Sequence, residues 1–188
     1  DIMFYQNFNI FLQSKNLRTK NINNCKNIQD FLEIYESFYL TKGLMSLKKL
    51  PDRSIDFIFS HAVLEHIRKK DFLKTIKEIR RIIKNTGYCS HQIDLTDHLG
   101  GNLNNLRFSE PLWESDFMVK SGFYTNRICY SEILELFKKC DFKIEDVQKV
   151  VWDKLPISRS KLSPEFRNRL EEDILISGFS VKLNPNLN

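Results

Sequence analysis

The sequence predicts an α/β fold, and two neighbouring patterns predict it. A short apolar run at Ile55–Ser60 follows a turn at Pro51–Ser54 and is rich in residues that favour strands. Such a run is typical of a strand that is buried on both faces in a parallel sheet. Directly after it the apolar residues change to helical spacing, as at Val63 and Ile67. Ligands bind beyond the carboxyl ends of strands in open parallel sheets, which here means Ser60–His61.

The chain before this unit is predicted to be mainly helical. Ile2–Leu17 has an apolar helical face, and Ile28–Tyr35 has the pattern of a second, short helix after a polar, Asn-rich loop. Phe38–Thr41 is predicted to be a short strand that ends at Gly43. We therefore expect an N-terminal helical region over residues 1–37, with the sheet beginning after it.

A βαβ unit is predicted around the first strand. The helix is expected over Lys70–Lys84, and Gly87 has the position of a C-terminal cap. Cys89–Leu95 is predicted to be a strand parallel to Ile55–Phe59. One helical stripe is expected to be buried against these strands, and it consists of Ile76, Ile79 and Ile83.

The second half of the chain begins with a long connection, Thr96–Arg127, that is too apolar to be disordered. Long connections in compact domains are often functional, so we interpret it as a lid or substrate-binding insert. A helix over Tyr130–Lys139 follows. Two strands close the pattern, Phe142–Trp152 and Ile174–Leu183, with a basic excursion between them. This order predicts a final antiparallel pair.

Composition limits the class of protein. The 188 residues suffice for one domain, and 41% hydrophobic with 28% charged residues is an ordinary globular balance. The net charge of +5 comes from basic residues scattered among acidic ones, which argues against nucleic-acid binding. The four cysteines form no CxxC pair and are predicted to be free thiols, and no HxxxH or HExxH pattern indicates a metal site.

The sequence also shows no sign of membrane insertion or secretion. No apolar run approaches the roughly 20 residues that a membrane span needs, and no basic start precedes a long apolar core. We therefore predict a cytoplasmic location. The chain begins at Asp1 rather than at Met, so a signal upstream of it stays open.

Several segments carry a resemblance to a known family. Ser54–Ile58 followed by Val63–His66 resembles the fourth strand and next turn of class I S-adenosylmethionine-dependent methyltransferases of the methyltransferase type 11 kind. The chain from Phe38 to Leu183 is similar to a largely uncharacterised subgroup that is often associated with surface-polysaccharide gene clusters. The three further segments that carry this resemblance are Ser90–His98, Asn105–Glu110 and Ser121–Arg127. The first motif is moderately specific, and all of them in order are a strong signal.

The resemblance implies a Rossmann-like sheet, but one that is incomplete. The family's first strand is followed by a glycine-rich turn, and its second ends in an acidic residue that holds the cofactor ribose. This chain has six glycines and no GxG. We predict that the first two strands are missing, that a long insert follows the fifth strand of the family pattern, and that the sequence is a fragment or truncated gene product. The expected parts of a single partial domain over 1–188 are a helical region at 1–37, sheet and helices at 38–95 and 128–183, and the insert at 96–127.

Candidate catalytic residues follow the two central strands. Methyl transfer from a sulfonium depends on holding donor and acceptor in line, and a general base assists when the acceptor is a hydroxyl or amine. The predicted catalytic residues are His61, Asp97 and His98, although Asp97 is equally suited to a turn or N-cap.

Three neighbouring ionisable residues have structural interpretations of at least equal weight. His66 is as well explained by a cap at the loop–helix junction as by a functional role. Glu65 is interpreted as a first-turn acid that the helix dipole favours. His91 alternates away from Asp94 and is predicted to be structural.

Binding residues are predicted from the resemblance and from residue type. The cofactor would be S-adenosylmethionine, with predicted contacts at Leu44, Ser46, Leu47, Ser60 and His61. Predicted substrate-binding residues are Arg107, Trp113, Tyr124, Asn126 and Arg127. The alternatives stay open: arginine commonly ties down loops through backbone carbonyls, and Trp113 with Tyr124 can form the core of the insert.

The sequence supports two functional classes. The first is an S-adenosylmethionine-dependent methyltransferase domain that acts on an unidentified small or saccharide-like acceptor, with no nucleic-acid or membrane partner. The second is a non-catalytic, methyltransferase-like binding or interaction module, or a truncated gene product. The absence of a GxG turn also predicts that residues 1–188 alone bind S-adenosylmethionine weakly or not at all.

Overall fold

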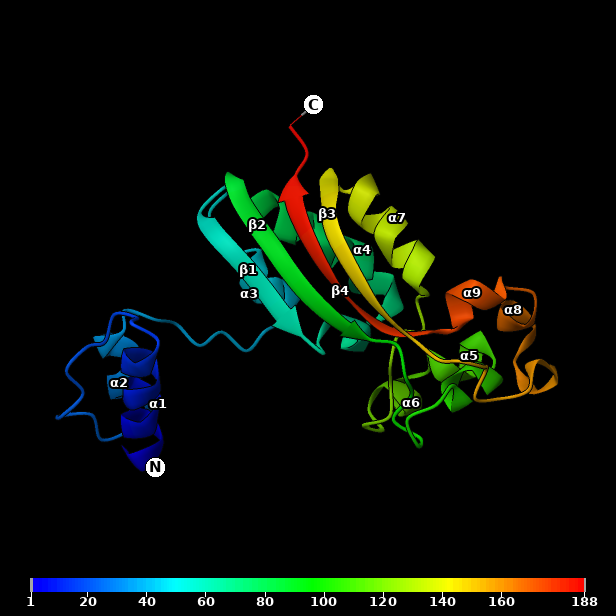
Figure 1. Cartoon of the computed structure of the whole chain (residues 1–188), viewed down its shortest axis with the longest axis horizontal. Helices are drawn as coiled ribbons and strands as arrows, with labels where there is room; N and C mark the ends of the chain where they lie inside the picture. The colour runs from blue at the N-terminus through cyan, green and yellow to red at the C-terminus, as the bar shows by residue number, and fades with distance from the viewer. Residues whose placement is uncertain (1, 188) are drawn as a thin grey trace. The chain divides into compact units, whose positions relative to one another are not determined.

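The computed structural model describes residues 2–187, with side chains from Met3 onward, and contains two compact units (Figure 1). The division falls between Ser46 and Leu47, later in the chain than the boundary at residue 37 expected from the sequence. The two units are described separately.

The N-terminal unit is helical, as predicted. It contains α1 (Ile2–Ser14) and α2 (Ile28–Ile34), joined by the expected polar loop. The side chain of Asn27 caps α2 by accepting hydrogen bonds from the backbone N–H groups of Gln29 and Asp30. A small core forms around three buried side chains, those of Tyr5, Ile22 and Cys25. The predicted apolar face of α1 is largely exposed at Phe4, Phe8 and Phe11, because this small core covers little of the helix.

The strand predicted at Phe38–Thr41 does not form. This segment is irregular, and Phe38 and Tyr39 are 88% and 80% exposed. A strand is stabilised by hydrogen bonds to a neighbouring strand, and no strand among residues 2–187 pairs with this segment. Strand propensity alone is therefore not enough to make this segment a strand. The short helix α3 (Leu44–Leu47) follows and spans the division between the units.

The C-terminal unit is built on a four-stranded mixed sheet in the order β1-β2-β4-β3. The strands are β1 (Ile55–His61), β2 (Ile83–Asp94), β3 (Phe142–Val151) and β4 (Ile176–Pro185). The β1–β2 pair is parallel, and β4 pairs antiparallel with both β2 and β3. The predicted parallel neighbours and the closing antiparallel pair are both confirmed.

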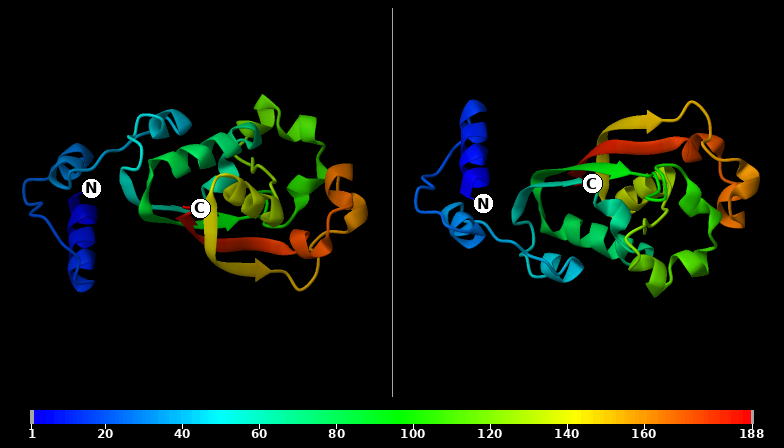
Figure 2. Two further views of the ribbon diagram at one scale, coloured as in Figure 1. Left: turned by 90° about the horizontal axis from the view of Figure 1, so that it is seen from above. Right: turned by 90° about the horizontal axis from the view of Figure 1, so that it is seen from below.

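One face of this sheet carries the helices α4 (Lys69–Ile82) and α7 (Tyr130–Lys139), as Figure 2 shows. The stripe predicted for the first helix is buried, with Ile76 and Ile79 against the sheet. The alternation predicted for β2 is also confirmed, because Cys89, His91 and Ile93 all point into the core. Burial of this apolar surface holds the βαβ unit together.

The opposite face of the sheet is not covered by other parts of the C-terminal unit, so within this unit the first strand is not buried on both faces as predicted. Phe57 is 44% and Phe59 is 70% exposed. The strand lies at the edge of the sheet, so its apolar residues on this face pack only against one another and against Tyr88. The apolar pattern of β1 is typical of a strand buried on both faces, but only one face of β1 is buried within the C-terminal unit.

Gly87 does not cap the helix, which also corrects a prediction. The helix α4 ends at Ile82, and β2 begins at once with Ile83. Gly87 lies inside β2, where a Cβ atom would stand 2.7 Å from the backbone oxygen of Asp56. The β1–β2 register shifts at this point, so glycine is needed for close approach of the two strands rather than for a helix stop.

The predicted insert is structured by short helices: η2 (Asn104–Arg107), α5 (Glu110–Trp113) and α6 (Asp116–Val119). The later excursion contains η3 (Arg159–Lys161), α8 (Pro164–Arg167) and α9 (Glu171–Ile174). Both segments contribute to a second apolar core, formed by Leu103, Leu106, Cys129, Leu162, Phe166 and Ile174. The four cysteines are free and buried, and no helix between residues 2 and 187 is long and apolar enough to cross a membrane.

Candidate functional site

The turn after β1 lies where the sequence places the ligand edge of the sheet. The strand ends at His61, and Ala62 adopts a left-handed backbone conformation with φ of 51°. The N–H of Ala62 donates to the carbonyl of Gln92 at 3.0 Å, which ties the turn to β2. Non-glycine residues at positive φ are uncommon, and such strain concentrates at functional sites.

Ser60 and His61 point to opposite faces of β1. The Ser60 hydroxyl hydrogen-bonds to Nδ1 of the buried His91 at 2.8 Å. Burial lowers the pKa of His91 to about 4, so this imidazole is neutral near pH 7, and its predicted structural role is confirmed. His61 is exposed and lines an open hollow of about 280 Å³ together with Gln92 and Asp94. The hollow is a site that a ligand can reach.

The other residues predicted to contact a cofactor lie at the division between the units. The hydroxyl of the buried Ser46 accepts a hydrogen bond from the N–H of Lys42 at 3.0 Å, and Leu47 packs against the main core. Leu44 and Ser46 belong to the N-terminal unit, whose placement relative to Ser60 is not fixed. Cofactor contacts by these residues stay predictions.

The structure brings His66 and His98 together. Their rings stack with centroids 5.0 Å apart, and Nδ1 of His66 donates to the carbonyl of Tyr124 at 3.0 Å. Asp97 is buried, and its two carboxylate oxygens accept from the backbone N–H groups of Leu99 and Asn104. The turn interpretation of Asp97 is thus confirmed. A base role for Asp97 would require breaking these bonds, whereas His98 is exposed.

Asn126 ties the end of the insert to the turn that follows β1. Its amide nitrogen donates to the carbonyls of Leu64 and Ile67 at 2.8 and 3.0 Å, and its side-chain oxygen accepts from the N–H of Ile128 at 3.1 Å. Its backbone N–H donates to the carbonyl of Glu65 at 2.7 Å. The buried side chain is therefore part of the frame, and its polar atoms are already used.

Arg127 is a second part of this frame. Its guanidinium donates to the carbonyls of Asn105 and Phe108 at 3.1 and 2.7 Å and pairs with Glu110. Burial lowers the pKa of Arg127, an effect that the Glu110 carboxylate partly offsets. The alternative interpretation, in which arginine ties down loops, is confirmed for this residue.

The aromatic residues of the insert form its core. Trp113 is fully buried and donates from Nε1 to the carbonyl of Thr125 at 2.7 Å. The Tyr124 hydroxyl donates to a Glu114 carboxylate oxygen at 2.7 Å, and burial is the main cause that raises its pKa. The core interpretation is confirmed for both rings. Among the predicted substrate-binding residues, Arg107 alone is exposed, and its side chain makes no hydrogen bond or ion pair to residues 2–187.

Glu65 is an acid in the first turn of a helix, as predicted, but that helix has only three residues and the burial of Glu65 was not predicted. It is 2% exposed, and neither carboxylate oxygen has a hydrogen-bond partner within the described chain. Burial raises its pKa above the usual value, and this effect exceeds the opposing effect of the nearby backbone N–H groups of Glu65 and Asp94 and of the His66 charge. It lies in the three-residue η1 (Leu64–His66) rather than in the first turn of a long helix, so the helix dipole does not explain it. The short 3₁₀ turn directs its side chain inward, which no periodicity in the sequence indicates.

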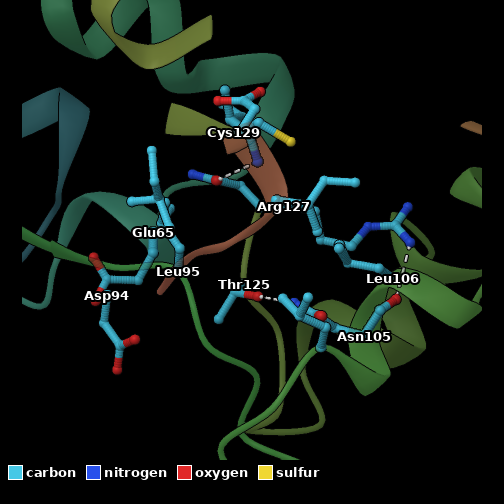
Figure 3. Close-up of a pocket in the computed structure, with 14 residues that line it drawn as sticks. Glu65, Asp94, Leu95, Asn105, Leu106, Thr125, Arg127 and Cys129 are labelled. Atoms are coloured by element: carbon cyan, nitrogen blue, oxygen red, sulfur yellow. Dashed lines mark hydrogen bonds between the residues drawn. The ribbon is translucent and has the colours of Figure 1, made fainter. Parts of the chain in front are cut away.

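The Glu65 side chain lines a small cavity of about 30 Å³ at the carboxyl ends of β1 and β2. Figure 3 shows Glu65 and Asp94 on one side of this cavity and Asn105 and Arg127 on the other. The side-chain oxygen of Asn105 is also without a partner in the described structure. Asp94 lines both this cavity and the open hollow beside His61.

The comparisons with known proteins concern the fold and the family. Residues 16–90 match the family model of a methyltransferase domain, Methyltransf_11. A crystal structure of an S-adenosylmethionine-dependent methyltransferase from Methanosarcina mazei is similar, with a TM-score of 0.54 and 16% identity over 81% of this chain and 68% of that one. A Pyrococcus horikoshii OT3 protein gives a TM-score of 0.50 and 15% identity over 95% and 76% of the two chains.

Coverage of these relatives is partial. In a Haloferax volcanii complex of the methyltransferase activator Trm112 with a methyltransferase, the match has a TM-score of 0.42 and 13% identity, covering 74% of this chain and 57% of that one. No curated protein sequence matches the chain. At these identities the structural matches show the fold, and the family-model match confirms the resemblance indicated by the motifs.

Proposed function

Starting from a methyltransferase-type domain of the S-adenosylmethionine-dependent class, we propose that this chain carries the acceptor side of a methyl-transfer site. The observation that carries the proposal is the arrangement at the carboxyl ends of β1 and β2. The strained Ala62 turn, the exposed His61 and the His66–His98 stack all lie there, next to the insert. The acceptor proposed is a small or saccharide-like molecule.

The residues present do not fit a complete S-adenosylmethionine site. The chain has no GxG sequence, and its one adjacent glycine pair, Gly100–Gly101, lies in the insert rather than after a strand. β2 ends in an acidic residue, Asp94, but the resemblance matches this strand to the family's fifth strand rather than to its second. We limit the proposed cofactor contribution to one wall of the open hollow, formed by His61, Gln92 and Thr96.

Within this site we assign different tasks to the predicted residues. His61 and His98 are exposed and are proposed to face the ligands, and Arg107 is proposed to meet an anionic or sugar group of the acceptor. Asp97, Asn126 and Arg127 are proposed to hold the insert in place rather than to touch the acceptor. The insert would thus bind through its exposed residues and keep its shape through its buried ones.

A non-catalytic, methyltransferase-like binding module is the second candidate. Two observations favour it: the absence of a GxG turn, and the position of β1 at an open edge of the sheet. Such a module would keep the fold while having no affinity for the cofactor. The first candidate predicts that S-adenosylmethionine binds at the carboxyl ends of β1 and β2, and the second predicts that it does not.

Titration of the ¹⁵N-labelled chain with S-adenosylmethionine distinguishes them. The proposal predicts weak, saturable NMR shifts, with a Kd on the order of 1 mM, because few anchors offset the entropy lost on binding. These shifts should be confined to Ser60–His66 and Asp94–His98. The matched control is Arg53, at the opposite end of the sheet, which should not move.

Two results would contradict the proposal. Absence of any shift at Ser60–His66, even at saturating ligand, would favour the binding module. Tight, stoichiometric binding by isothermal titration would mean that the N-terminal unit contains a cofactor site that the sequence does not reveal. The variant His61→Ala should reduce the shifts near β1 without unfolding the chain, because His61 is exposed.

A further inference from the structure

The small cavity beside Glu65 has an imbalance of hydrogen-bonding groups. Both Glu65 carboxylate oxygens and the side-chain oxygen of Asn105 are buried acceptors without a donor in the described chain. The Asn105 amide nitrogen is already used, because it donates to the Thr125 hydroxyl at 3.0 Å. Three acceptor oxygens and one donor, Nε of Arg127, are therefore unpaired among the residues that line this space, so acceptors remain in excess. Buried acceptors of this kind destabilise a protein unless something pairs with them.

Apart from Nε of Arg127, a buried donor without a partner, the neighbouring polar side chains of the lining are paired. The side-chain nitrogen and oxygen of Asn126 are fully paired, and Asp94 accepts from both the N–H and the hydroxyl of Thr96 at 2.8 and 2.7 Å. Asp173, another lining residue, accepts from the N–H and hydroxyl of Ser131. The unpaired acceptors are thus a local feature of Glu65 and Asn105, on opposite sides of the cavity (Figure 3).

The lining limits the chemistry of what can occupy the cavity. Its volume of about 30 Å³ admits a group of one or two heavy atoms. The carboxylates of Asp94 and Asp173 exclude an anion, and the charge of Arg127 is already balanced by Glu110. Apolar walls at Leu95, Leu103 and Leu106 suit a carbon attached to the polar atom. A hydroxyl or ammonium on a single carbon meets all of these conditions.

We propose that this cavity binds a hydrogen-bond-donating group, a hydroxyl or ammonium on one carbon, between the oxygens of Glu65 and Asn105. The identification of that group as part of the methyl acceptor rests on the proposed function, whereas binding in the cavity does not. In this arrangement Glu65 contacts the donating group of the acceptor, whereas His61 faces the open hollow. Asp94, which lines both spaces, lies between the two.

The direct test uses methylammonium and methanol as probes with the full chain. NMR of protein labelled at the Glu side-chain carboxyl carbons and Asn side-chain amides should show saturable shifts at Glu65 and Asn105. If methylammonium alone saturates, the donor is an ammonium; if methanol alone saturates, it is a hydroxyl. Glu65→Gln should weaken methylammonium binding at least about fivefold, because it removes the negative charge. No saturable shift with either probe means that the cavity holds only water and overturns the proposal.

Thermal unfolding supplies a readout that needs no ligand. A carboxyl kept for binding should destabilise the free protein, so Glu65→Leu should raise Tm by about 2–4 °C. The matched control is Glu110→Gln, which removes a carboxylate paired with Lys69 and Arg127 and should lower Tm. A lower Tm for Glu65→Leu would assign this residue a structural role. Neither test uses S-adenosylmethionine, so failure of the proposed function and failure of this inference are distinguishable.

Discussion

Asn126 and Glu65 are buried polar residues joined by a backbone hydrogen bond, yet their side chains differ completely in how they are satisfied. The Asn126 amide makes three side-chain hydrogen bonds, to Leu64, Ile67 and Ile128. The Glu65 carboxylate makes none with the described chain. The contact between the end of the insert and the turn after β1 therefore contains one side chain that stabilises the fold and one that destabilises it.

This difference distinguishes buried polar residues that hold the fold together from buried polar residues that are free to bind a ligand. A buried amide with all its partners contributes to stability and leaves nothing with which to bind a ligand. A buried carboxyl without partners costs stability, and proteins keep such groups chiefly where function requires them. Asn105 and Arg127 are mixed: the Asn105 nitrogen is paired and its oxygen is not, and the two terminal nitrogens of Arg127 are paired whereas its Nε is not. Variants at Arg127, Asn126, Glu65 and Glu110 test this division, in order of decreasing expected effect.

Arg127→Ala should have the largest effect. It removes two bonds to backbone carbonyls, leaves Glu110 with one cation fewer, and opens space between Trp113 and Phe166. We expect the free energy of unfolding to fall by about 3–5 kcal/mol in urea denaturation. The control Arg107→Ala, at an exposed arginine of the same insert, should change it by less than about 0.5 kcal/mol. Equal effects of the two variants would contradict the structural role assigned to Arg127.

Asn126→Ala should have the next largest effect. The buried carbonyl of Leu64 and the N–H of Ile128 would lose their partners. We expect a loss of about 2–3 kcal/mol in the free energy of unfolding. Asn102→Ala is the control, since its amide bonds only to the nearby carbonyl of Gly100 at 3.3 Å. A loss below about 0.5 kcal/mol for Asn126→Ala would contradict the assignment.

Glu65→Gln should change how stability depends on pH. Burial raises the folded-state pKa of Glu65, so the folded protein holds this proton above the pH at which the unfolded chain releases it. The stability of the unsubstituted protein should therefore fall as pH rises from about 4.5 through the folded pKa, by about 1.4 kcal/mol for each pH unit that separates the folded and unfolded pKa values. The variant should lack this fall.

The opposite sign is expected at Glu110. Burial alone would raise its pKa, but the neighbouring Lys69 and Arg127 hold it below the usual value. Its stabilising effect should be present above the unfolded-state pKa and be lost as pH falls through the folded value. Subtracting the unfolding profiles of Glu65→Gln and Glu110→Gln from that of the unsubstituted chain should give slopes of opposite sign. Slopes of the same sign would mean that Glu65 has a partner.

Phe59→Ser should have the smallest effect on stability. The ring is 70% exposed on the uncovered face, so its loss should change the free energy of unfolding by less than about 0.5 kcal/mol. Light scattering should show less association, because an exposed apolar edge strand favours aggregation. Ile93→Ser, on the covered face of the same sheet, is the contrasting variant and should unfold much more easily. A large loss for Phe59→Ser would mean that another segment covers that face.

The sequence predicted elements whose partners lie nearby in the chain. Apolar periodicity located α4 and α7 because each packs on strands close to it in sequence. The errors concern partners that are distant or absent: Phe38–Thr41 has strand propensity but no neighbouring strand in the described chain, and Gly87 is explained by Asp56 across the sheet rather than by the helix before it.

The strand end at the candidate site was predicted from the sequence, whereas the surroundings of its residues were not. Ser60–His61 does mark the carboxyl end of β1, because a change from strand to helical spacing locates a strand end. The roles of Asp97 and Arg127 needed the hydrogen bonds of the folded chain to decide between two interpretations. Glu65 could not be found, because a single 3₁₀ turn decides whether its side chain faces solvent or the cavity.

The carboxyl carbon of Glu65, followed by NMR through a pH titration with and without methylammonium, tests the central claim most directly. The charged groups that face Glu65 are Asp94 and His66. We predict a midpoint above the ordinary glutamate value of about 4.3, and a lower midpoint when methylammonium is present, because the bound cation favours the carboxylate. An ordinary midpoint that methylammonium leaves unchanged would show that Glu65 is neither unpaired nor part of a binding site.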